Sequence, residues 1–547
     1  MKTKKETKYI FVCGGVLSGL GKGITTASIG LLLKNAGFKV GAVKIDPYIS
    51  MDAGTMRPQE HGEVFVTKDG GEIDQDLGNY ERFLDEDFTK DHNITTGKVY
   101  AQVIDNERHF IYAGRDAEII PDVINEIKRR IDFVSEGKDF VLVEIGGTVG
   151  DIENMPFLIA AREIGRESKS AYFMVTYLPL LHTVGELKTK PTQHAVMLLR
   201  QQGINPDFIV TRAEERVDEP RLDNISKRCF LDRENIFDIP DQPTIYNVPK
   251  VLKDQGLENA LFKFFNIKPK DKSGEIYKEW NQFTEYFLTN GKPHIKVGLV
   301  GKYVQHGNHA HMDSYISVLE SLRHAGFAND VKVDIEMISS EDLTKENYIE
   351  KLKYLNGIIV PQGWGSRGME GKLLAIKYAR ENNVPYLGLC YGMQMAVIEF
   401  ARNVLGLKDA NSEEVDPDTK NPVIHLMEEQ KKHMADGLFG GTIRLGNWPC
   451  KLKKKTRAFQ VYEDEIDENG IIYERHRHRY EFNNEYREKL EKAGLKISGT
   501  SPNDLLVEMV EIPEHKFFIG TQGHPEYRSR PLRPHPLFVE FVKATAR

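Results

Sequence analysis

Tyr9-Ile-Phe-Val-Cys13 runs into Gly14-Gly-Val-Leu-Ser-Gly-Leu-Gly-Lys-Gly23 and then into the helical stretch Ile24–Asn35. A strand that passes through a glycine-rich loop into a helix offers backbone N–H groups to an anion, and Lys22 adds charge for phosphates. The loop is not a strict Walker A sequence, because Val16 and Gly23 stand where that motif has Gly and a hydroxyl residue. A tight structural turn is the alternative. We favour phosphate binding.

Short apolar runs alternate with amphipathic stretches through the first 250 residues. The runs are nearly continuous in Val, Ile and Phe, which is typical of buried parallel strands. Strand and helix in alternation predict a doubly wound α/β sheet with ligands at the carboxyl ends of its strands. The expected strands are Phe38–Ile45, Phe140–Ile145, Ala171–Tyr177, Phe208–Val210 and Ile236–Ile239.

A polar stretch from Lys268 to Gly274 interrupts this series, followed by a helical pattern over about 275–288 and a break at Asn290-Gly-Lys-Pro293. We place a domain boundary here. The sequence therefore predicts an N-terminal domain over 1–267, a linker with a helix over 268–293 and a second α/β domain over 294–547. The strands expected in the second domain are His294–Val300, Val331–Ile338, Gly357–Val360, Val384–Leu389 and Phe517–Thr521.

The composition is that of an ordinary globular protein. Of 547 residues, 40% are hydrophobic and 28% charged, which excludes collagen, coiled coil and bulk disorder. The formal net charge of −7 argues against a dedicated nucleic-acid binder. Four cysteines without CxxC spacing predict a cytoplasmic protein. The apolar run after the basic start ends at Gly14, too short for a signal peptide or a membrane span, so we expect no membrane association.

The segment Val384-Pro-Tyr-Leu-Gly-Leu-Cys-Tyr-Gly-Met-Gln394 predicts a strand that turns sharply into a helix. Glycines on both sides of Cys390 permit the strained turn that projects a nucleophile, and the helix N-terminus behind it lowers a thiol pKa. Downstream, His524 and Glu526 lie two residues apart, so in an extended segment they point to the same side. A thiol, an imidazole and a carboxylate together indicate acyl transfer from an amide. A buried structural cysteine and a surface histidine are the alternatives.

The segments Gly388–Gln394, Gln522–Glu526 and Pro361-Gln-Gly-Trp-Gly365 resemble the triad and oxyanion loop of class I glutamine amidotransferases. Nearly the whole chain is similar to the CTP synthase family. The resemblance implies a P-loop-like amidoligase domain followed by a class I glutamine amidotransferase domain. It also implies that Cys390 attacks the glutamine amide, that His524 is the general base and acid, and that Glu526 orients it. The implied glutamine contacts are Gly363, Tyr391, Gly392, Met393, Gln394, Glu414 and Arg479.

Two carboxylates are candidate Mg²⁺ ligands, Asp76 and Glu144, because each lies where a strand is expected to end. A charge at the end of a buried strand is costly without a partner, which favours a metal over a solvated loop acid at Glu144. The family's metal ligands fall on the same two positions. By the same resemblance, ATP is bound by Ser18, Gly19, Leu20, Gly21, Lys22, Gly23, Lys44, Asp76 and Arg212. UTP or the CTP product is bound by Ser18, Asp151, Ile152, Glu153, Lys188, Thr189, Lys190, Pro191, Thr192 and Gln193.

The resemblance further implies the reaction and its regulation. ATP would phosphorylate O4 of UTP with Mg²⁺ bound, and ammonia from L-glutamine would displace the phosphate to give CTP. GTP is the implied allosteric activator and CTP the feedback inhibitor. A homotetramer is implied and filaments are allowed, with no nucleic-acid partner. The segment Arg57–Val64 matches the family's ammonia-channel gate.

Four features depart from the family pattern. Gln362 replaces a glycine and would be strained if the turn needs a positive φ. Gly523 stands where an aromatic is usual, and Asn224 replaces a lysine that contacts nucleotide, for which Lys227 or Arg228 could compensate. The histidine-rich insertion His306–Asp313 lengthens a loop that the family associates with GTP activation. We therefore expect altered GTP dependence.

Two rival functions stay open at this point. An amidoligase with another acceptor, such as a cobyrinate-type carboxylate, would share the loop variant and the glutaminase domain but not the Lys188–Gln193 segment. A non-catalytic nucleotide switch or filament scaffold would not need Cys390, His524 and Glu526. The first rival would form no CTP from UTP, so an assay for CTP tests it. The second rival would not hydrolyse glutamine, so an assay for glutaminase activity tests it.

Overall fold

The computed structural model describes residues 7–17, 19–181, 183, 185–306, 309–310, 312–435 and 440–547. The chain forms two compact units. The first unit comprises Met1–Asp52 and Asn79–Leu288, and the second comprises Ala53–Gly78 and Thr289–Arg547. A short stretch from the N-terminal half of the sequence thus belongs to the same unit as the C-terminal half.

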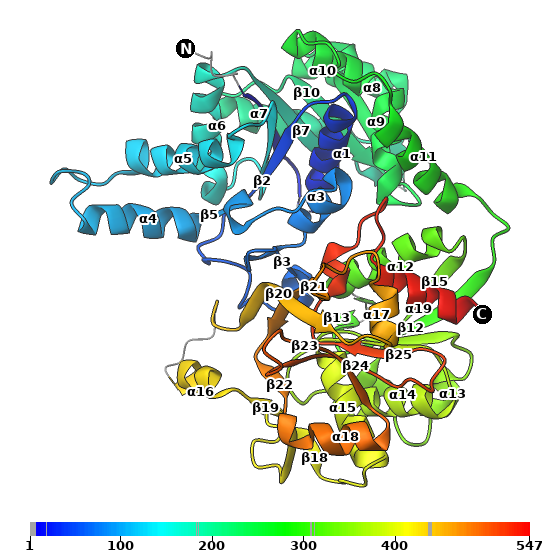
Figure 1. Cartoon of the computed structure of the whole chain (residues 1–547). Coiled ribbons are helices and arrows are strands. Elements are labelled where there is room, and N and C mark those ends of the chain that lie inside the picture. Colours follow the sequence, from blue (N-terminus) through cyan, green and yellow to red (C-terminus); the bar gives the residue numbers. More distant parts are fainter. Residues whose placement is uncertain are drawn as a thin grey trace. The chain divides into compact units, whose positions relative to one another are not determined.

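The first unit contains a seven-stranded sheet in the order β11-β10-β7-β1-β6-β2-β5 (Figure 1). Every neighbouring pair is parallel, which confirms the doubly wound α/β prediction. The strands are β1 (Lys8–Gly14), β2 (Val40–Asp46), β5 (Asn93–Thr95), β6 (Phe140–Ile145), β7 (Ser170–Tyr177), β10 (Phe208–Ala213) and β11 (Ile236–Pro240).

Both faces of this sheet are covered by helices, because successive residues of a strand point to opposite sides. Val141 and Val143 of β6 belong to a buried cluster with residues from the helices of one face. Leu142, between them, faces the other way and meets α1, where a Cβ at Gly30 would lie 2.8 Å from its Cδ1. The first face carries α4 (Thr96–Arg108), α5 (Ile124–Ser135), α6 (Met155–Glu167), α7 (Lys190–Gln201) and α8 (Glu219–Cys229), and the helices that contact α1 (Lys22–Asn35) are α9 (Val248–Asp254), α10 (Leu257–Phe265) and α11 (Glu275–Leu288).

The second unit contains a nine-stranded mixed sheet in the order β15-β12-β16-β17-β25-β24-β23-β20-β21. The first five strands are parallel and match the expected α/β series. The remaining four run antiparallel, an extension that the sequence did not predict. The strands are β15 (Lys332–Ser339), β12 (His294–Gly301), β16 (Gly357–Val360), β17 (Tyr386–Leu389), β25 (Phe518–Thr521), β24 (Val507–Glu511), β23 (Lys496–Thr500), β20 (Arg444–Leu452) and β21 (Ile471–His478).

The stretch 53–78 forms the antiparallel hairpin β3 (Val64–Val66) and β4 (Glu72–Asp74) within the second unit. Two buried side chains of that unit hold the hairpin by its backbone carbonyls. Tyr527 donates its hydroxyl to Val64 O at 2.9 Å, and Arg475 Nη1 donates to Val66 O at 2.9 Å. The hairpin therefore lies next to the segment that carries His524 and Glu526.

The main helices of the second unit are α12 (Ile316–Ala328), α14 (Met369–Glu381), α15 (Tyr391–Asn403) and α19 (Pro536–Ala546). The smaller elements of the chain are α2 (Pro58–His61), α3 (Asp76–Leu84), β8 (Leu180–Leu181), β9 (Glu186–Leu187), β13 (Gln305–His306), β14 (His309–Ala310), α13 (Tyr348–Leu352), β18 (Ala410–Ser412), β19 (Asn421–Leu426), α16 (Glu428–Ala435), α17 (Arg457–Val461), β22 (Tyr480–Phe482) and α18 (Arg487–Ala493). Among the described residues, no helix has both the length and the apolar character needed to cross a membrane.

Candidate active site

Cys390 lies between β17 and α15 in a backbone conformation that side-chain-bearing residues rarely adopt, with φ 51° and ψ −101°. Such strain is typical of a nucleophile held at a sharp strand-to-helix turn. Gly392 lets the helix start this close to the neighbouring strand, because a Cβ there would lie 2.0 Å from Val360 O. The structure thus contains the strand–turn–helix that the two glycines predict.

His524 and Glu526 follow β25, which pairs directly with β17. The His524 Nδ1 and the Glu526 Oε1 are 2.7 Å apart, and both side chains are buried. Burial alone would lower the pKa of His524, but the Glu526 carboxylate and the Cys390 thiol outweigh burial and raise that pKa to about 10. The imidazole is therefore held in its protonated form beside the thiol at neutral pH.

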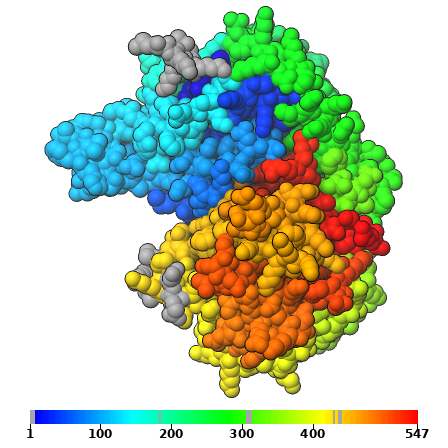
Figure 2. All heavy atoms as spheres, in the orientation of Figure 1, coloured from blue at the N-terminus to red at the C-terminus, as the bar shows by residue number. Residues whose placement is uncertain are grey.

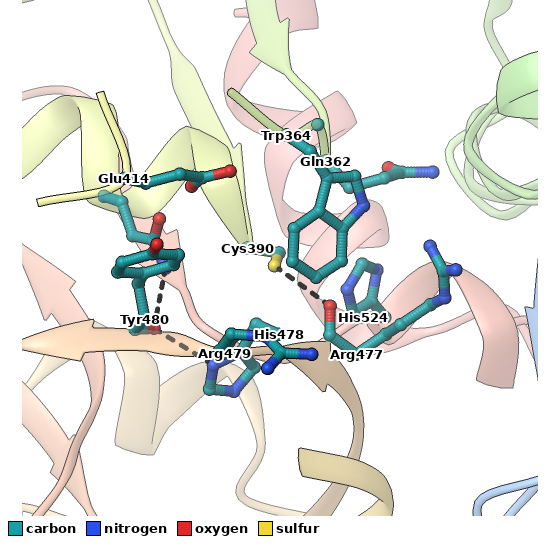
Figure 3. A pocket seen from close by; sticks show the side chains of 11 residues that line it. Gln362, Trp364, Cys390, Glu414, Arg477, His478, Arg479, Tyr480 and His524 are labelled. Atoms are coloured by element: carbon teal, nitrogen blue, oxygen red, sulfur yellow. Dashed lines mark hydrogen bonds between the residues drawn. The ribbon is translucent and has the colours of Figure 1, made fainter. Parts of the chain in front are cut away.

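A cavity brings Cys390 and His524 face to face with polar side chains (Figure 3). The Cys390 Sγ lies 3.9 Å from Arg477 O and 3.6 Å from the Gln522 Nε2. Within the part of the chain that the structure describes, the His524 Nε2 has no hydrogen-bond partner and is available to a substrate. The cavity is lined by Gln362, Gly363, Trp364, Cys390, Gln394, Glu414, Arg477, His478, Arg479, Tyr480 and His524.

Two lysines hold the loop 361–365 that faces Cys390. Lys372 Nζ donates to Pro361 O at 3.2 Å, and Lys302 Nζ donates to Gly365 O at 3.3 Å. Burial lowers the pKa of Lys302 to about 8 and lowers the pKa of Lys372 well below its usual range. Gln362 is not among the described residues with a positive φ, so its replacement of glycine brings no backbone strain.

Three of the expected glutamine contacts bring polar groups to the cavity. Glu414 accepts a hydrogen bond from Gly365 N at 2.5 Å, and burial raises the pKa of its carboxyl. Gln394 donates to Tyr480 O at 2.9 Å and to the Gln522 Oε1 at 3.2 Å. Arg479 donates to the Thr442 Oγ1 at 3.3 Å. A carboxylate and a guanidinium on one cavity suit the ammonium and carboxylate ends of an amino acid.

Of the other predicted glutamine contacts, one lines the cavity and three do not. Gly363 lines the cavity, whereas Tyr391, Gly392 and Met393 form the first turn of α15 and are not among its described lining residues. The Tyr391 hydroxyl instead donates to Gly365 O at 2.8 Å. Sequence reasoning did not single out four residues that line the cavity and one that contacts the thiol, although Trp364 and Gln522 lie within the motifs quoted above. The five residues are Trp364, Arg477, His478, Tyr480 and Gln522.

The packing around position 523 explains why a glycine stands there in this chain. A Cβ at this position would lie 2.8 Å from the Cβ of Glu474. Glu474 is itself buried and accepts hydrogen bonds from Tyr462 at 2.9 Å and Arg528 at 3.2 Å. The space that a larger residue would need is thus occupied by Glu474.

In the first unit, the glycine-rich loop lies at the carboxyl end of β1. Lys22 Nζ donates to Gly147 O at 3.0 Å and is largely buried. Arg212, on β10, approaches the loop, with its Nε 3.8 Å from the place of a Cβ on Gly21. Lys22 and Arg212 therefore both lie at this loop, while Gly19, Leu20 and Gly23 complete it and Ser18 lies outside the described residues.

Lys44 and Glu144 lie opposite each other on the neighbouring strands β2 and β6. Their charged atoms are 3.9 Å apart, Lys44 also lies 3.1 Å from Asp46, and Tyr80 donates its hydroxyl to Glu144. Asp76 begins α3 and is assigned to the second unit. Among the described residues, no group of three or more His, Cys, Asp or Glu side chains is arranged as a metal site. Mg²⁺ bound with nucleotide phosphates needs only one or two carboxylates, so Glu144 fits that role.

A cavity of about 530 Å³ in the first unit brings together several predicted UTP contacts. Asp151, Lys190 and Pro191 line it, with Val16 of the glycine-rich loop and His194 of α7. Ile152 and Glu153 are exposed, and Lys188 pairs with Glu186 at 2.7 Å. Another predicted contact, Thr192, lies in the core, 2.8 Å from the Thr176 hydroxyl.

Asn224 joins two helices next to this segment. Its Oδ1 accepts hydrogen bonds from Gln193 at 3.1 Å and from Thr189 at 3.2 Å. It therefore positions the N-terminal turn of α7 through two predicted UTP contacts. In the insertion, His306 and His309 pair in a short β-hairpin, whereas His311 lies outside the described residues.

Two family profiles match this chain. The one described as CTP synthase N-terminus matches residues 8–267, and the one described as Glutamine amidotransferase class-I matches residues 310–544. A CTP synthase of Clostridium acetobutylicum is 51% identical over 543 residues, which are 98% of each chain. One of Carboxydothermus hydrogenoformans is 52% identical over 545 residues, again 98% of each chain. The solved glutaminase domain of a Trypanosoma brucei CTPS with bound acivicin is 38% identical, with a TM-score of 0.42, over 46% of this chain and 94% of that one.

Proposed function

Because the chain belongs to the CTP synthase family, whose members are glutamine-hydrolysing ligases, we propose that it aminates UTP with ammonia released from glutamine at Cys390. The observation that supports the glutaminase half is that Cys390 and His524 line one cavity, with Glu526 hydrogen-bonded to the His524 imidazole. The reaction divides into glutamine hydrolysis in the second unit and UTP activation in the first.

Glutamine hydrolysis follows from the arrangement of the triad. The Cys390 thiolate attacks the side-chain carbonyl carbon, and backbone N–H groups of the loop 361–365 and of α15 stabilise the oxyanion. The C–N bond then breaks, and the His524 imidazolium gives its proton to the departing ammonia. Water deprotonated by His524 cleaves the thioester and returns glutamate. Glu414 and Arg479 hold the two charged ends of the substrate, together with Gly363 and Gln394, and Tyr391, Gly392 and Met393 contribute through the first turn of α15.

UTP activation is assigned to the glycine-rich loop and its neighbours. Lys22 and Lys44 face the phosphate that passes from ATP to O4 of UTP and stabilise its charge, with Arg212 and the loop residues 18–23 on the nucleotide. Glu144 would hold Mg²⁺, which would neutralise charge on phosphate oxygens when bound. Ammonia attacks C4 of the phosphorylated UTP, and phosphate leaves. Asp151, Ile152 and Glu153 recognise the pyrimidine, and the segment Lys188–Gln193 the triphosphate.

Ammonia passes from the second unit to the first without release to solvent, because protonated ammonium is no nucleophile. The segment Arg57–Val64 lies in the second unit beside the glutaminase cavity, which supports its role as the exit gate. We assign activation to GTP and feedback inhibition to CTP, and the insertion His306–Asp313 alters the response to GTP. Deleting His306–His311 and measuring glutamine-dependent activity against GTP concentration tests this assignment, since an unchanged response contradicts it.

Self-association into a tetramer involves the first unit. Helices α4 and α5 extend together away from its sheet (Figures 1 and 2). This projection exposes Ile104, Phe110, Ile111 and Phe133. Apolar side chains gathered on a projecting arm are typical of protein contacts. Native mass measurement of the wild type and of Phe110→Asp tests the arm, and an unchanged tetramer in the variant contradicts its role.

The decisive test of the proposed function follows the nitrogen. Wild-type protein is incubated with UTP, ATP, Mg²⁺ and glutamine labelled with ¹⁵N in the side-chain amide. We expect labelled CTP, ADP, phosphate and unlabelled glutamate. Formation of glutamate without CTP would leave a glutaminase coupled to another acceptor, and the absence of both products would contradict the proposal.

A further inference from the structure

A second cavity adjoins the glutaminase cavity inside the same unit. Glu63 and Val64, from the stretch 53–78, line it together with Tyr527. Gln362, Gly363, Trp364 and Arg477 line both cavities. The two cavities therefore share one wall, with Cys390 in one cavity and Val64 in the other.

The side chain of Gln362 is the polar part of this wall. Its Nε2 donates to the Glu63 Oε1 at 3.3 Å, and the Glu63 Oε2 accepts the backbone N–H of Ser317 at 3.0 Å. Glu63 is buried, so its carboxylate fixes the amide in one orientation. Figure 3 shows the amide end of Gln362 pointing away from the Cys390 sulfur.

The carbonyl end of the same amide has no hydrogen-bond donor in the part of the chain that the structure describes. Among the described residues, none donates a hydrogen bond to the Gln362 Oε1, although the atom is buried. A buried acceptor without a donor is costly, and functional sites are where such groups persist. The Glu63 bond also sets which end of the amide is free, because the Nε2 must face the carboxylate.

We propose that Gln362 is a transfer residue for ammonia: its Oε1 accepts a hydrogen bond from ammonia that leaves the Cys390 cavity and passes it to the cavity beside Glu63 and Val64. The inference rests on the proposed function, which supplies the ammonia. Neutral ammonia is a donor of three N–H bonds, and the free Oε1 is an acceptor at the wall that it must cross. An apolar wall of the same width would strip ammonia of its hydrogen bonds and slow its passage.

The test compares the CTP formed with the glutamate formed in the full-length enzyme. Gln362→Met keeps the length of the side chain but removes the acceptor. We expect its ratio of CTP to glutamate to fall at least threefold, with ammonium appearing in the medium. CTP synthesis from added ammonia should stay within twofold of wild type, and the ratio of CTP to glutamate is read independently of any change in the glutaminase rate. Gln362→Asn, which retains an amide, should keep a higher ratio than Gln362→Met.

The control is Gln460→Leu, which removes an amide from an exposed position on α17 outside both cavities. A merely structural role for Gln362 would lower glutaminase activity, and with it CTP and glutamate together, leaving their ratio unchanged. An unchanged ratio in Gln362→Met overturns the inference. If the wild type forms no CTP from glutamine, the proposed function fails instead, and the two failures are distinguishable.

Discussion

The ring of Tyr527 stacks on the imidazole of His524, with centroids 5.1 Å apart and planes inclined by 12°. The Tyr527 hydroxyl donates to Val64 O at 2.9 Å. One side chain thus fixes the plane of the catalytic imidazole and anchors the hairpin β3–β4. The catalytic residue and the hairpin are far apart in the sequence and are brought together only by the fold.

Replacing Tyr527 by Phe keeps the stacked ring and removes the hydrogen bond to Val64. We expect glutaminase kcat/KM to stay near the wild-type value and the free energy of unfolding to fall by about 1–2 kcal/mol. Tyr527→Leu, which also removes the ring, should lower kcat/KM further. Steady-state glutaminase assays and thermal denaturation measure both effects. Equal losses of activity in the two variants would assign the hydroxyl a role in the chemistry itself.

Glu526→Gln removes the charge that does most to raise the pKa of His524. The imidazolium should then lose its proton at lower pH than in the wild type, where the pKa is about 10. We expect the alkaline limb of the glutaminase kcat/KM profile to move to lower pH and kcat to fall by roughly 10²-fold. A fall in kcat with the alkaline limb unmoved would contradict the electrostatic role of Glu526.

Glu474 is a buried carboxylate whose interactions with its partners make the stability of the protein depend on pH in the acidic range. Burial would raise its pKa, but His535 at 2.9 Å and Arg528 at 3.2 Å outweigh burial and lower the pKa to about 2. Because the folded-state pKa is depressed, the stabilisation is complete above the ordinary carboxyl pKa of roughly 4.3 and is lost as the pH falls toward 2.

Glu474→Gln should therefore destabilise the protein by about 3 kcal/mol at neutral pH, because it removes the buried carboxylate that pairs with Arg528 and His535. The difference between variant and wild type should shrink as the pH falls below about 4. Urea denaturation at several pH values measures it. A difference that stays constant down to a pH of about 2.5 would mean that the carboxylate charge does not contribute.

Lys22→Met removes the cation of the glycine-rich loop and changes no residue of the second unit. We expect CTP synthesis from added ammonia to fall by roughly 10²-fold or more, because the charge that develops on phosphoryl transfer loses a partner. Glutaminase activity should persist. Lys268→Met, at an exposed position of the first unit, serves as the matched control. Retained CTP synthesis in Lys22→Met would remove the loop from the phosphoryl-transfer site.

Local sequence patterns predicted the parallel strands well, because a buried parallel strand is apolar along its whole length. β6 begins and ends where the run Phe140–Ile145 does, and α11 covers the helical pattern at 275–288. The strand-to-helix turn at Cys390 could also be predicted from the sequence, since glycines at 388 and 392 are what such a sharp turn requires. The spacing of these glycines and the His-x-Glu pair therefore allowed the nucleophile and its two partners to be predicted without a structure.

Other features depend on contacts between distant segments and had no local signal. The antiparallel strands β20 and β21 are interrupted by charged residues, because several of their charges pair inside the fold, as Arg444 does with Glu508 at 2.8 Å. The stretch 53–78 joins the second unit through hydrogen bonds to residues far along the chain, among them Tyr527 and Arg475. Likewise, the lack of a donor for the Gln362 Oε1 among the described residues can be recognised only once Glu63 is placed beside the amide.

The central claim is that one site makes ammonia and another consumes it. Cys390→Ala tests it most directly, with CTP formation measured from UTP and ATP and with either glutamine or ammonium chloride as the nitrogen source. Cys450→Ala, at a buried thiol outside the cavity, is the control. We predict that Cys390→Ala makes no CTP from glutamine and retains the wild-type rate with ammonia. Loss of both reactions in a folded variant, or CTP formation from glutamine without the thiol, would contradict the account.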